Sequence, residues 1–183
     1  MTFEPAAFVH RLAAAEIGAT FNFYRAGRRA ALRRERLVAY LESRRRARIL
    51  LVGEAAGYRG ARVSGLPFTS ERQLSGHAPG EATATVVHRV LAELGLAREV
   101  LLWNLVPTHP RRPDEPRSNR QPSRAEVEAG ASFLAELAGD RLVVPVGRLA
   151  HARLGGTYVR HPSHGGAAAF RAGLLDSLRA ANS

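Results

Sequence analysis

The stretch 49–74, ILLVGEAAGYRGARVSGLPFTSERQL, decides the fold of this chain. It opens with four consecutive apolar residues, the pattern of a strand buried on both faces of a sheet. A polar, glycine-rich loop follows, and Pro67-Phe68 leads into an expected helix. In open α/β sheets, ligand sites form beyond the carboxyl ends of the strands. We therefore expect a binding site in this loop, although a tight turn with a solvated acid, Glu54, would give the same pattern.

Further apolar runs repeat this alternation of strand and helix. Strands are expected at 100–103, 142–146 and 157–159, and helices at 5–17, 28–46, 81–94, 147–154 and 167–180. A capping-box pattern, Ser123 followed by Glu126, predicts one more helix. Strands that alternate with helices favour a parallel sheet covered on both faces. We therefore expect an α/β fold, a three-layer α/β/α sandwich with a central four-stranded parallel sheet. It should form a single domain, 1–183, whose N-terminal helical, arginine-rich part is 1–46.

The charge of the chain indicates a polyanionic partner. Its formal net charge is +11, and all 27 basic residues are arginine. A protein this basic attracts polyanions, because each neutralised phosphate releases counterions. Nucleic acid is therefore the expected partner, although a basic surface can also serve solubility alone. The arginines of the expected helix 28–46 could likewise contact phosphates or form a solvated face.

Composition also excludes several kinds of site. Cysteine is absent, so the chain can form no disulfide, thiolate zinc site or cysteine-ligated iron–sulfur cluster. No apolar stretch approaches the ~20 residues needed to span a bilayer, and the N-terminus has an early acid and no basic signal region. We expect a soluble, cytoplasmic protein, monomeric by default.

Side chains able to do chemistry follow three of the expected strands. Glu54 and Phe68 lie in the loop after the first strand. Asn104 follows the second strand, and His161 follows the fourth. The carboxyl ends of parallel strands open on one edge of a sheet, so these side chains should meet there. Singly, Asn104 could cap a turn, His161 could be a satisfied loop histidine and Phe68 could belong to the core.

These segments resemble the signature motifs of the uracil-DNA glycosylase superfamily, and most closely those of its iron–sulfur branch. The first motif of that branch reads G-E-x-P-G followed by G-x-P-F. Five segments match in the correct order, namely 53–69 (GEAAG and GLPFT), 101–104 (LLWN), 119–126 (NRQPS and Glu126), 146–150 (VGRLA) and 161–163 (HPS). A lone H-P-S would carry no weight, but five ordered segments are specific.

The resemblance implies a pocket that holds a base flipped out of DNA. Phe68 would stack on the base beside Gly53, and the Asn104 amide would hydrogen-bond the edge of the base as donor and acceptor. His161 would stabilise negative charge on the departing base, and Glu54 would orient or activate water. The candidates for a duplex wedge are His164, Gly165 and the neighbouring arginines. The expected DNA-binding residues are Arg59, Arg62, Arg111, Ser163, His164 and Gly165.

Several positions depart from the branch. Where its cluster cysteines stand, this chain has Thr108 and Gly130, so no iron–sulfur cluster, and no other cofactor or metal, is expected. Ala56 replaces the motif proline. Gly57 occupies the place where the uracil-specific branch has a tyrosine that excludes thymine, which leaves strict uracil specificity open.

Two more positions concern the mechanism. One branch traps its product covalently through a histidine, and the matching position here is Asn119, so no covalent adduct is expected. Another branch places its acidic residue after F-T-G, and Glu71 could take that part. Glu54 is the first choice for the catalytic acid and Glu71 is the reserve.

We therefore expect a monofunctional DNA glycosylase of base-excision repair, which hydrolyses the N-glycosidic bond of uracil or a related deaminated base in single- or double-stranded DNA. A non-catalytic nucleic-acid-binding homologue of the same fold is the main alternative, because the first motif is altered and the charge alone would serve binding. A nucleoside-processing α/β enzyme is a third.

Overall fold

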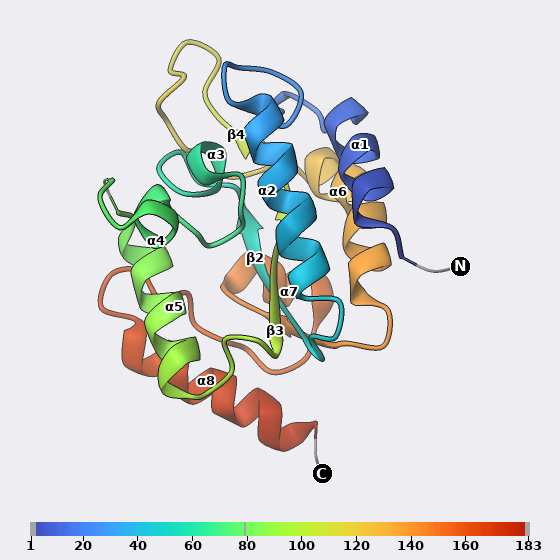
Figure 1. Cartoon of the computed structure of the whole chain (residues 1–183). Helices are drawn as coiled ribbons and strands as arrows, with labels where there is room; N and C mark the ends of the chain where they lie inside the picture. Colours follow the sequence, from blue (N-terminus) through green and yellow to red (C-terminus); the bar gives the residue numbers. More distant parts are fainter. Residues whose placement is uncertain (1–2, 79, 182–183) are drawn as a thin grey trace.

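The computed structural model describes residues 3–78 and 80–181, which fold around a parallel sheet with helices on both faces (Figure 1). Strand β2 (Ile49–Ala55) lies in the middle of this sheet. Strands β3 (Val100–Val106) and β5 (Leu142–Pro145) pair with it on either side, both in parallel. The carboxyl ends of all three strands therefore open on the same edge of the sheet.

In the described residues the sheet has three strands, so the prediction of a fourth strand at 157–159 is corrected. Only Val159 pairs, through a single parallel bridge to Val146. The chain turns at Gly155 and Gly156, whose φ angles of 71° and 78° are left-handed, and Pro162 cannot donate to a ladder. The single bridge still brings the segment that follows it to the carboxyl edge of the sheet.

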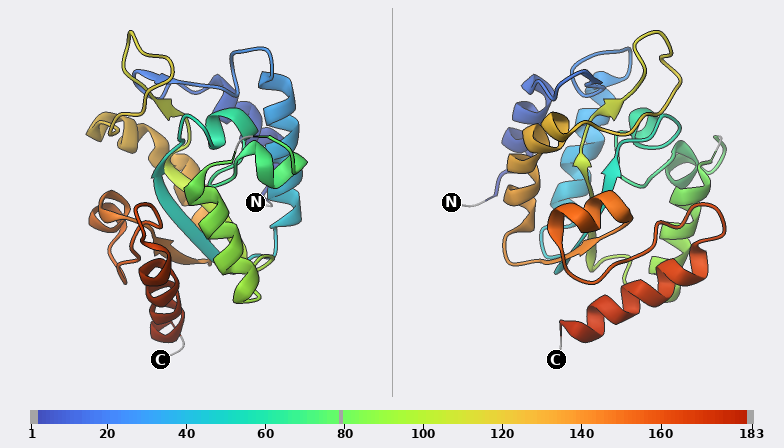
Figure 2. Two further views of the ribbon diagram at one scale, coloured as in Figure 1. Left: turned by 90° about the vertical axis from the view of Figure 1, so that its left-hand side faces the viewer. Right: turned by 180° about the vertical axis from the view of Figure 1, so that it is seen from behind.

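Alternate residues of β2 enter two separate cores, as expected for a strand buried on both faces. Leu50 and Val52 belong to a core formed with α1 (Pro5–Ala14), α2 (Ala30–Ser43) and α6 (Arg124–Ala138). Ile49 and Leu51 belong to a second core with α5 (Ala82–Glu93) and α8 (Ala167–Ala180). Figures 1 and 2 show these two groups of helices on opposite sides of the sheet, which gives three layers. A short helix, α7 (Arg148–Leu154), contacts β2 and β5.

Both long strands run further than their apolar sequences indicate. The prediction ended them at Val52 and Trp103, but pairing continues through Gly53 with Asn104 and Ala55 with Val106. Glu54 and Asn104 therefore lie within the last residues of β2 and β3 and do not follow them. A strand fixes the direction of a side chain more firmly than a loop does, because its backbone is held by pairing with a neighbouring strand.

The described connecting segments contain two short strands and a short helix that were not predicted from the sequence, together with one helix that was. Strand β1 (Thr20–Phe21) pairs antiparallel with β4 (His109–Pro110), which ties the N-terminal segment to the long loop after β3. Helix α3 (Ala61–Ser64) lies in the glycine-rich loop. The helix expected after Phe68 is α4 (Glu71–Ser75), which begins after a capping box formed by Ser70 and Gln73. None of the described helices is long and apolar enough to cross a bilayer.

Candidate active site

A cavity of about 370 Å³ opens at the carboxyl edge of the sheet, a volume within the range of small-molecule sites. Four widely separated segments contribute the side chains that the sequence singled out. The cavity is lined, among others, by Glu54, Phe68, Asn104 and His161. The same cavity is also lined by Glu81, Asn119 and Arg120, which come from the start of α5 and from the loop before α6.

Gly53 allows the ring and the amide to approach each other. A Cβ atom at this position would clash with the Phe68 ring and would lie 2.8 Å from the Asn104 Oδ1 atom. Both side chains are more than nine-tenths buried, at 8% and 4% exposure. Because Gly53 also pairs with Asn104 in the sheet, a stacking surface and a hydrogen-bonding amide sit side by side on rigid backbone.

The backbone of Phe68 is held in an unfavourable conformation. Its φ angle is +50°, in the left-handed region that a bulky residue rarely adopts. The next residue supports it, since the Thr69 hydroxyl donates to the Pro67 carbonyl at 2.9 Å. His88 of α5 lies 3.0 Å from the same hydroxyl and, with that hydroxyl proton already used, donates to it through Nε2–H. Burial lowers the pKa of His88, which favours this neutral form. The sequence contained no signal for this role.

His161 is oriented by its neighbour. The Ser163 backbone N–H donates to His161 Nδ1 at 3.3 Å, and the Ser163 hydroxyl lies 2.9 Å from the same atom. Because a backbone N–H can only donate, Nδ1 accepts and the neutral ring carries its proton on Nε2. Burial lowers the pKa of His161, so this neutral form is favoured. The imidazole thus has an N–H available for an oxygen atom in the cavity.

Two carboxylates line the cavity, although the sequence pointed to only one. Burial raises the pKa of Glu54 and of Glu81, because removal from water disfavours the charged form. Across residues 3–78 and 80–181, neither carboxylate has a hydrogen-bond or ion-pair partner. Glu81 appeared in the sequence only as the start of a helix, and its approach to the Gly57 loop depends on tertiary contact.

Glu71 lies elsewhere. Its carboxylate accepts two hydrogen bonds from Arg36, at 2.9 and 3.0 Å, and Arg29 lies 3.9 Å away. The hydrogen bonds from Arg36 lower the pKa of Glu71. The structure does not bring Glu71 to the cavity of Glu54 and His161, and its side chain is neutralised by arginine. Of the two acids considered from the sequence, only Glu54 faces that cavity.

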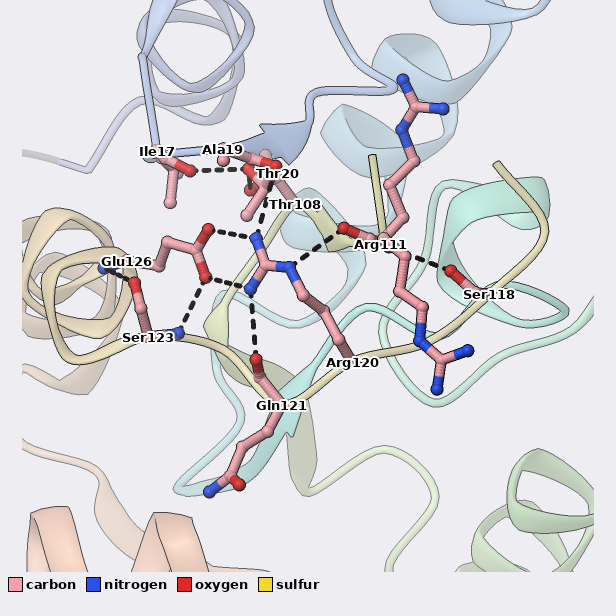
Figure 3. A network of polar contacts seen from close by, with 11 residues as sticks. Ile17, Ala19, Thr20, Thr108, Arg111, Ser118, Arg120, Gln121, Ser123 and Glu126 are labelled. Carbon is pink, nitrogen blue, oxygen red and sulfur yellow. Dashed lines mark hydrogen bonds and ion pairs between the residues drawn. The ribbon is translucent and has the colours of Figure 1, made fainter. Parts of the chain in front are cut away.

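Figure 3 shows the network that fixes the long loop before α6. The Arg120 guanidinium makes two hydrogen bonds to Glu126, at 2.8 and 2.5 Å. It also donates to backbone carbonyls, including that of Arg111 at 2.9 Å and that of Ala19 at 3.3 Å. Glu126 is only 2% exposed and accepts from the Ser123 backbone N–H at 2.8 Å. One buried carboxylate thus joins the loop, the N-terminal segment and the start of α6.

This network explains the spacing within the motif segment 119–126, in which Arg120 and Glu126 are six residues apart. Glu126 completes the capping box of α6 with Ser123, and it also receives Arg120. Asn119 then lies on the cavity wall, where its Oδ1 atom accepts from the Tyr58 backbone N–H at 2.9 Å. The loop is therefore connected to the glycine-rich loop of the first motif.

The positions that replace the cluster cysteines have structural roles here. Thr108 is fully buried, and its hydroxyl lies 2.5 Å from that of Thr20. A Cβ atom at Gly130 would clash with the Leu105 carbonyl, so this glycine lets α6 approach β3 closely. The chain has no cysteine, and these residues do not fit an iron–sulfur cluster. Within the described ranges, no group of three or more His, Asp or Glu side chains could hold a metal ion.

A second cavity, of about 880 Å³, is lined by residues of the glycine-rich loop, α3 and α4. Arg59 and Arg62 line it together with Tyr58, whose ring lies 4.7 Å from the Arg62 guanidinium. Arg111 lies apart, over the Phe21 ring at 5.7 Å, but it is close enough to contribute to the lowered pKa of Arg62, for which burial is the larger cause. In the part of the chain that is described, these three arginines form no ion pair with a carboxylate.

The loop after His161 is exposed at its tip. His164 has a φ angle of +51° and Gly165 one of +74°, and both are exposed. A Cβ atom at Gly166 would clash with the His161 carbonyl, so the loop folds tightly before α8. Ser163 is bound to the His161 ring, whereas His164 and Gly165 lie outside the cavity.

Comparison with known proteins assigns the chain to a family. The profile of the Uracil DNA glycosylase superfamily matches residues 41–177, which include every motif segment described above. The chain belongs to this superfamily, whose members are DNA glycosylases.

The fold also resembles a solved structure. The crystal structure of wild-type SMUG2 from Pedobacter heparinus superimposes with a TM-score of 0.69 and 13% sequence identity, covering 99% of each chain. At this identity the likeness concerns the fold. A search of curated protein sequences finds no significant match.

Proposed function

We propose that this protein is a monofunctional DNA glycosylase that hydrolyses the N-glycosidic bond of uracil or a related deaminated base flipped out of DNA. The observation that carries the proposal is that Glu54, Phe68, Asn104 and His161 line one cavity of about 370 Å³. That volume suits a single base, and the side chains supply what the reaction needs. Membership of the superfamily supports the same reaction class.

Recognition of the base rests on Phe68 and Asn104. The flat face of a pyrimidine stacks on the Phe68 ring, and the Asn104 amide offers a donor and an acceptor to the imide edge. Because Gly53 brings the two groups together, a base that stacks on the ring also reaches the amide. A base held in this way leaves its second carbonyl oxygen available to the imidazole.

Hydrolysis breaks the bond between C1′ of the sugar and the base nitrogen. The electron pair of that bond leaves with the base, and the Nε2–H of neutral His161 stabilises the negative charge on its oxygen. The Glu54 carboxylate favours the positive charge on the sugar and accepts a proton from the water that attacks C1′. The departing base takes up a proton on release, so the reaction consumes one water and needs no cofactor.

A hydrolytic course agrees with the composition. Glycosylases that form a Schiff base with the sugar need an amine nucleophile, and lysine is the side chain that provides one. The chain contains no lysine. We therefore expect the product to be an intact abasic strand, without cleavage by the enzyme.

The DNA backbone would lie along the arginines that form no ion pair with a carboxylate in the described residues. Arg59, Arg62 and Arg111 lie around the glycine-rich loop and the long loop, next to the cavity, and would contact phosphates. His164 and Gly165, at the exposed tip of the loop after His161, would enter the duplex when a base is extruded, and their exposure supports this role.

Base release on defined oligonucleotides tests the proposal. The protein is incubated with single- and double-stranded DNA containing uracil, hypoxanthine or xanthine, and abasic sites are then cleaved with alkali. We expect cleavage with at least one deaminated base, and none with Asn104→Ala at matched concentration. Oligonucleotide binding without release of any base, beside an active control enzyme, would favour the non-catalytic homologue. Turnover of free nucleosides but not of DNA would favour a nucleoside-processing enzyme.

A further inference from the structure

Glu81 is held in place by its backbone alone. It is the N-cap residue of α5, but its side chain makes no capping bond. Its backbone N–H donates to the Ser70 hydroxyl at 3.2 Å, and its carbonyl accepts from the Thr85 backbone N–H at 3.0 Å. The carboxylate lines the cavity that also contains Glu54.

Two glycines make room for this carboxylate. A Cβ atom at Gly57 would lie 3.0 Å from Glu81 Oε1, and a Cβ atom at Gly60 would clash with Oε2. Any other residue at Gly60 would therefore displace the carboxylate from the wall of the cavity. The glycine-rich loop and the start of α5 are shaped around the two oxygen atoms.

In a protein this basic, a carboxylate without an arginine partner is unusual. The chain carries a net charge of +11, and carboxylates on its surface and in its core are often bound by arginine, as Glu71 and Glu126 are. Within residues 3–78 and 80–181, Glu81 has no such partner although it is half-buried and burial raises its pKa. Partial removal from water without a cation or a donor disfavours the charged form, so folding alone gives no reason for this position.

We propose that Glu81 is a second catalytic carboxylate, which holds the attacking water together with Glu54. This inference rests on the proposed glycosylase function. The water donates one hydrogen bond to each carboxylate, and as its oxygen bonds to C1′ one of the two accepts its proton. The bond to the base breaks in the same step, and the base leaves with the electron pair.

Three conservative variants separate this role from the alternatives. Glu81→Gln and Glu54→Gln each keep the shape of the side chain and remove the charge. Glu93→Gln, at the other end of α5, removes one charge from an exposed i,i+4 pair with Arg89 and serves as the matched control. Single-turnover release of uracil, affinity for abasic product DNA and the thermal midpoint are measured for each variant and for the double variant Glu54→Gln/Glu81→Gln.

We expect Glu81→Gln to slow release by at least about 10-fold, within the range of general acid–base catalysis, while Glu93→Gln stays near wild type. The affinity of Glu81→Gln for product DNA should stay within about 3-fold, and its thermal midpoint should not fall, because a half-buried charge without a partner has been removed. If the carboxylates share one water, the double variant should be little slower than the slower single variant. Glu81→Ala repeats the test if the glutamine disturbs the loop.

Several results would overturn the role of Glu81 alone. They are a Glu81→Gln rate within about 3-fold of wild type, a slower rate with a lower thermal midpoint, or a changed ranking of damaged bases with the uracil rate preserved. Fully multiplicative losses in the double variant would show that the two acids act separately. If the wild-type protein releases no base at all, the proposed function fails and the inference about Glu81 fails with it.

Discussion

At the scale of the residue, Gly53 determines whether the base-binding wall can form. We predict that Gly53→Ala slows base release by about 100-fold, because the new methyl group displaces the Phe68 ring and the Asn104 amide from each other. Overpacking at this buried position should also lower the free energy of unfolding by about 1–3 kcal/mol. Single-turnover kinetics and denaturant unfolding measure the two effects.

A second glycine provides the control for this substitution. A Cβ atom at Gly173, in α8, would lie 3.1 Å from the Tyr158 carbonyl, so Gly173→Ala is also crowded. Gly173 does not line the cavity, and the folded fraction of this variant should release base at the wild-type rate. A wild-type rate for Gly53→Ala would show that the ring and the amide need not lie side by side.

The pH profile of base release reports the ionisation of Glu54 and His161. The reaction requires ionised Glu54, and because burial raises its pKa, activity should fall as pH decreases through a value above the ordinary 4.5 of a glutamate. The reaction also requires neutral His161, whose pKa is lowered from 6.5, so this group protonates only at more acidic pH than a free histidine. Release should therefore be constant above neutrality and should decline on the acid side.

Single-turnover rates between pH 4 and 9 test this expectation. The Glu54→Gln variant lacks the Glu54 carboxylate, so its profile should lose the part of the acid decline that Glu54 causes. A profile that declines toward alkaline pH in the range where histidine titrates would mean that His161 acts as a cation, contrary to the proposed mechanism.

At the scale of the element, the loop before α6 depends on one buried ion pair. Removing one partner of a buried pair leaves the other uncompensated, and the cost is about 3–5 kcal/mol. We predict that Glu126→Ala lowers the free energy of unfolding by an amount near the lower end of this range, since the Arg120 side chain is 25% exposed to solvent. The same substitution removes half of the capping box of α6. Denaturant unfolding measures the loss.

The neighbouring pair Arg124–Glu128 provides a matched control on the same helix. It is an exposed i,i+4 pair, and Glu128→Ala should leave stability essentially unchanged. The Arg120 guanidinium lowers the pKa of Glu126, so the stabilisation by this pair is present above the unfolded pKa and is lost as pH falls through the lower, folded value. Equal stability of the two variants would contradict the role assigned to Glu126.

At the scale of the whole molecule, charge predicts how DNA binding responds to salt. Each phosphate contact contributes about 0.9 to the slope of log affinity against log salt concentration. Arg59→Gln and Arg62→Gln should each reduce this slope by about 1, whatever the sequence of the oligonucleotide. Titrations of fluorescent duplex DNA at several salt concentrations measure the slope.

Arg48 serves as a control because its charge lies far from the cavity. It precedes β2, at the amino edge of the sheet and away from the cavity, and it pairs with Glu99 at 3.3 Å. Arg48→Gln also removes one positive charge, but it should leave the slope within error of wild type. Equal effects at Arg48 and Arg62 would mean that DNA contacts the basic surface without a preferred side.

Much of the fold was predictable because its signals are local. The four-residue apolar run at the start of β2 and the capping box at Ser123 each reflect interactions between near neighbours in the sequence. Parallel pairing then brings the carboxyl ends of β2 and β3 to one edge, which is why Glu54 and Asn104 could be expected together. The prediction of a fourth strand at 157–159 was wrong because pairing at Val159 depends on how Gly155 and Gly156 turn the chain. No local sequence pattern indicates that turn.

The amino-acid sequence by itself determined the class of fold, the absence of thiol chemistry, the basic charge and the order of the motif segments. Only the tertiary structure decided that Glu71 binds Arg36 while Glu81 reaches the cavity, and that Arg120 joins Glu126 across the loop. The physical reason is that the free energy of a carboxylate depends on water and cations within a few ångströms. Those neighbours come from distant parts of the chain, so they are known only when the chain is folded.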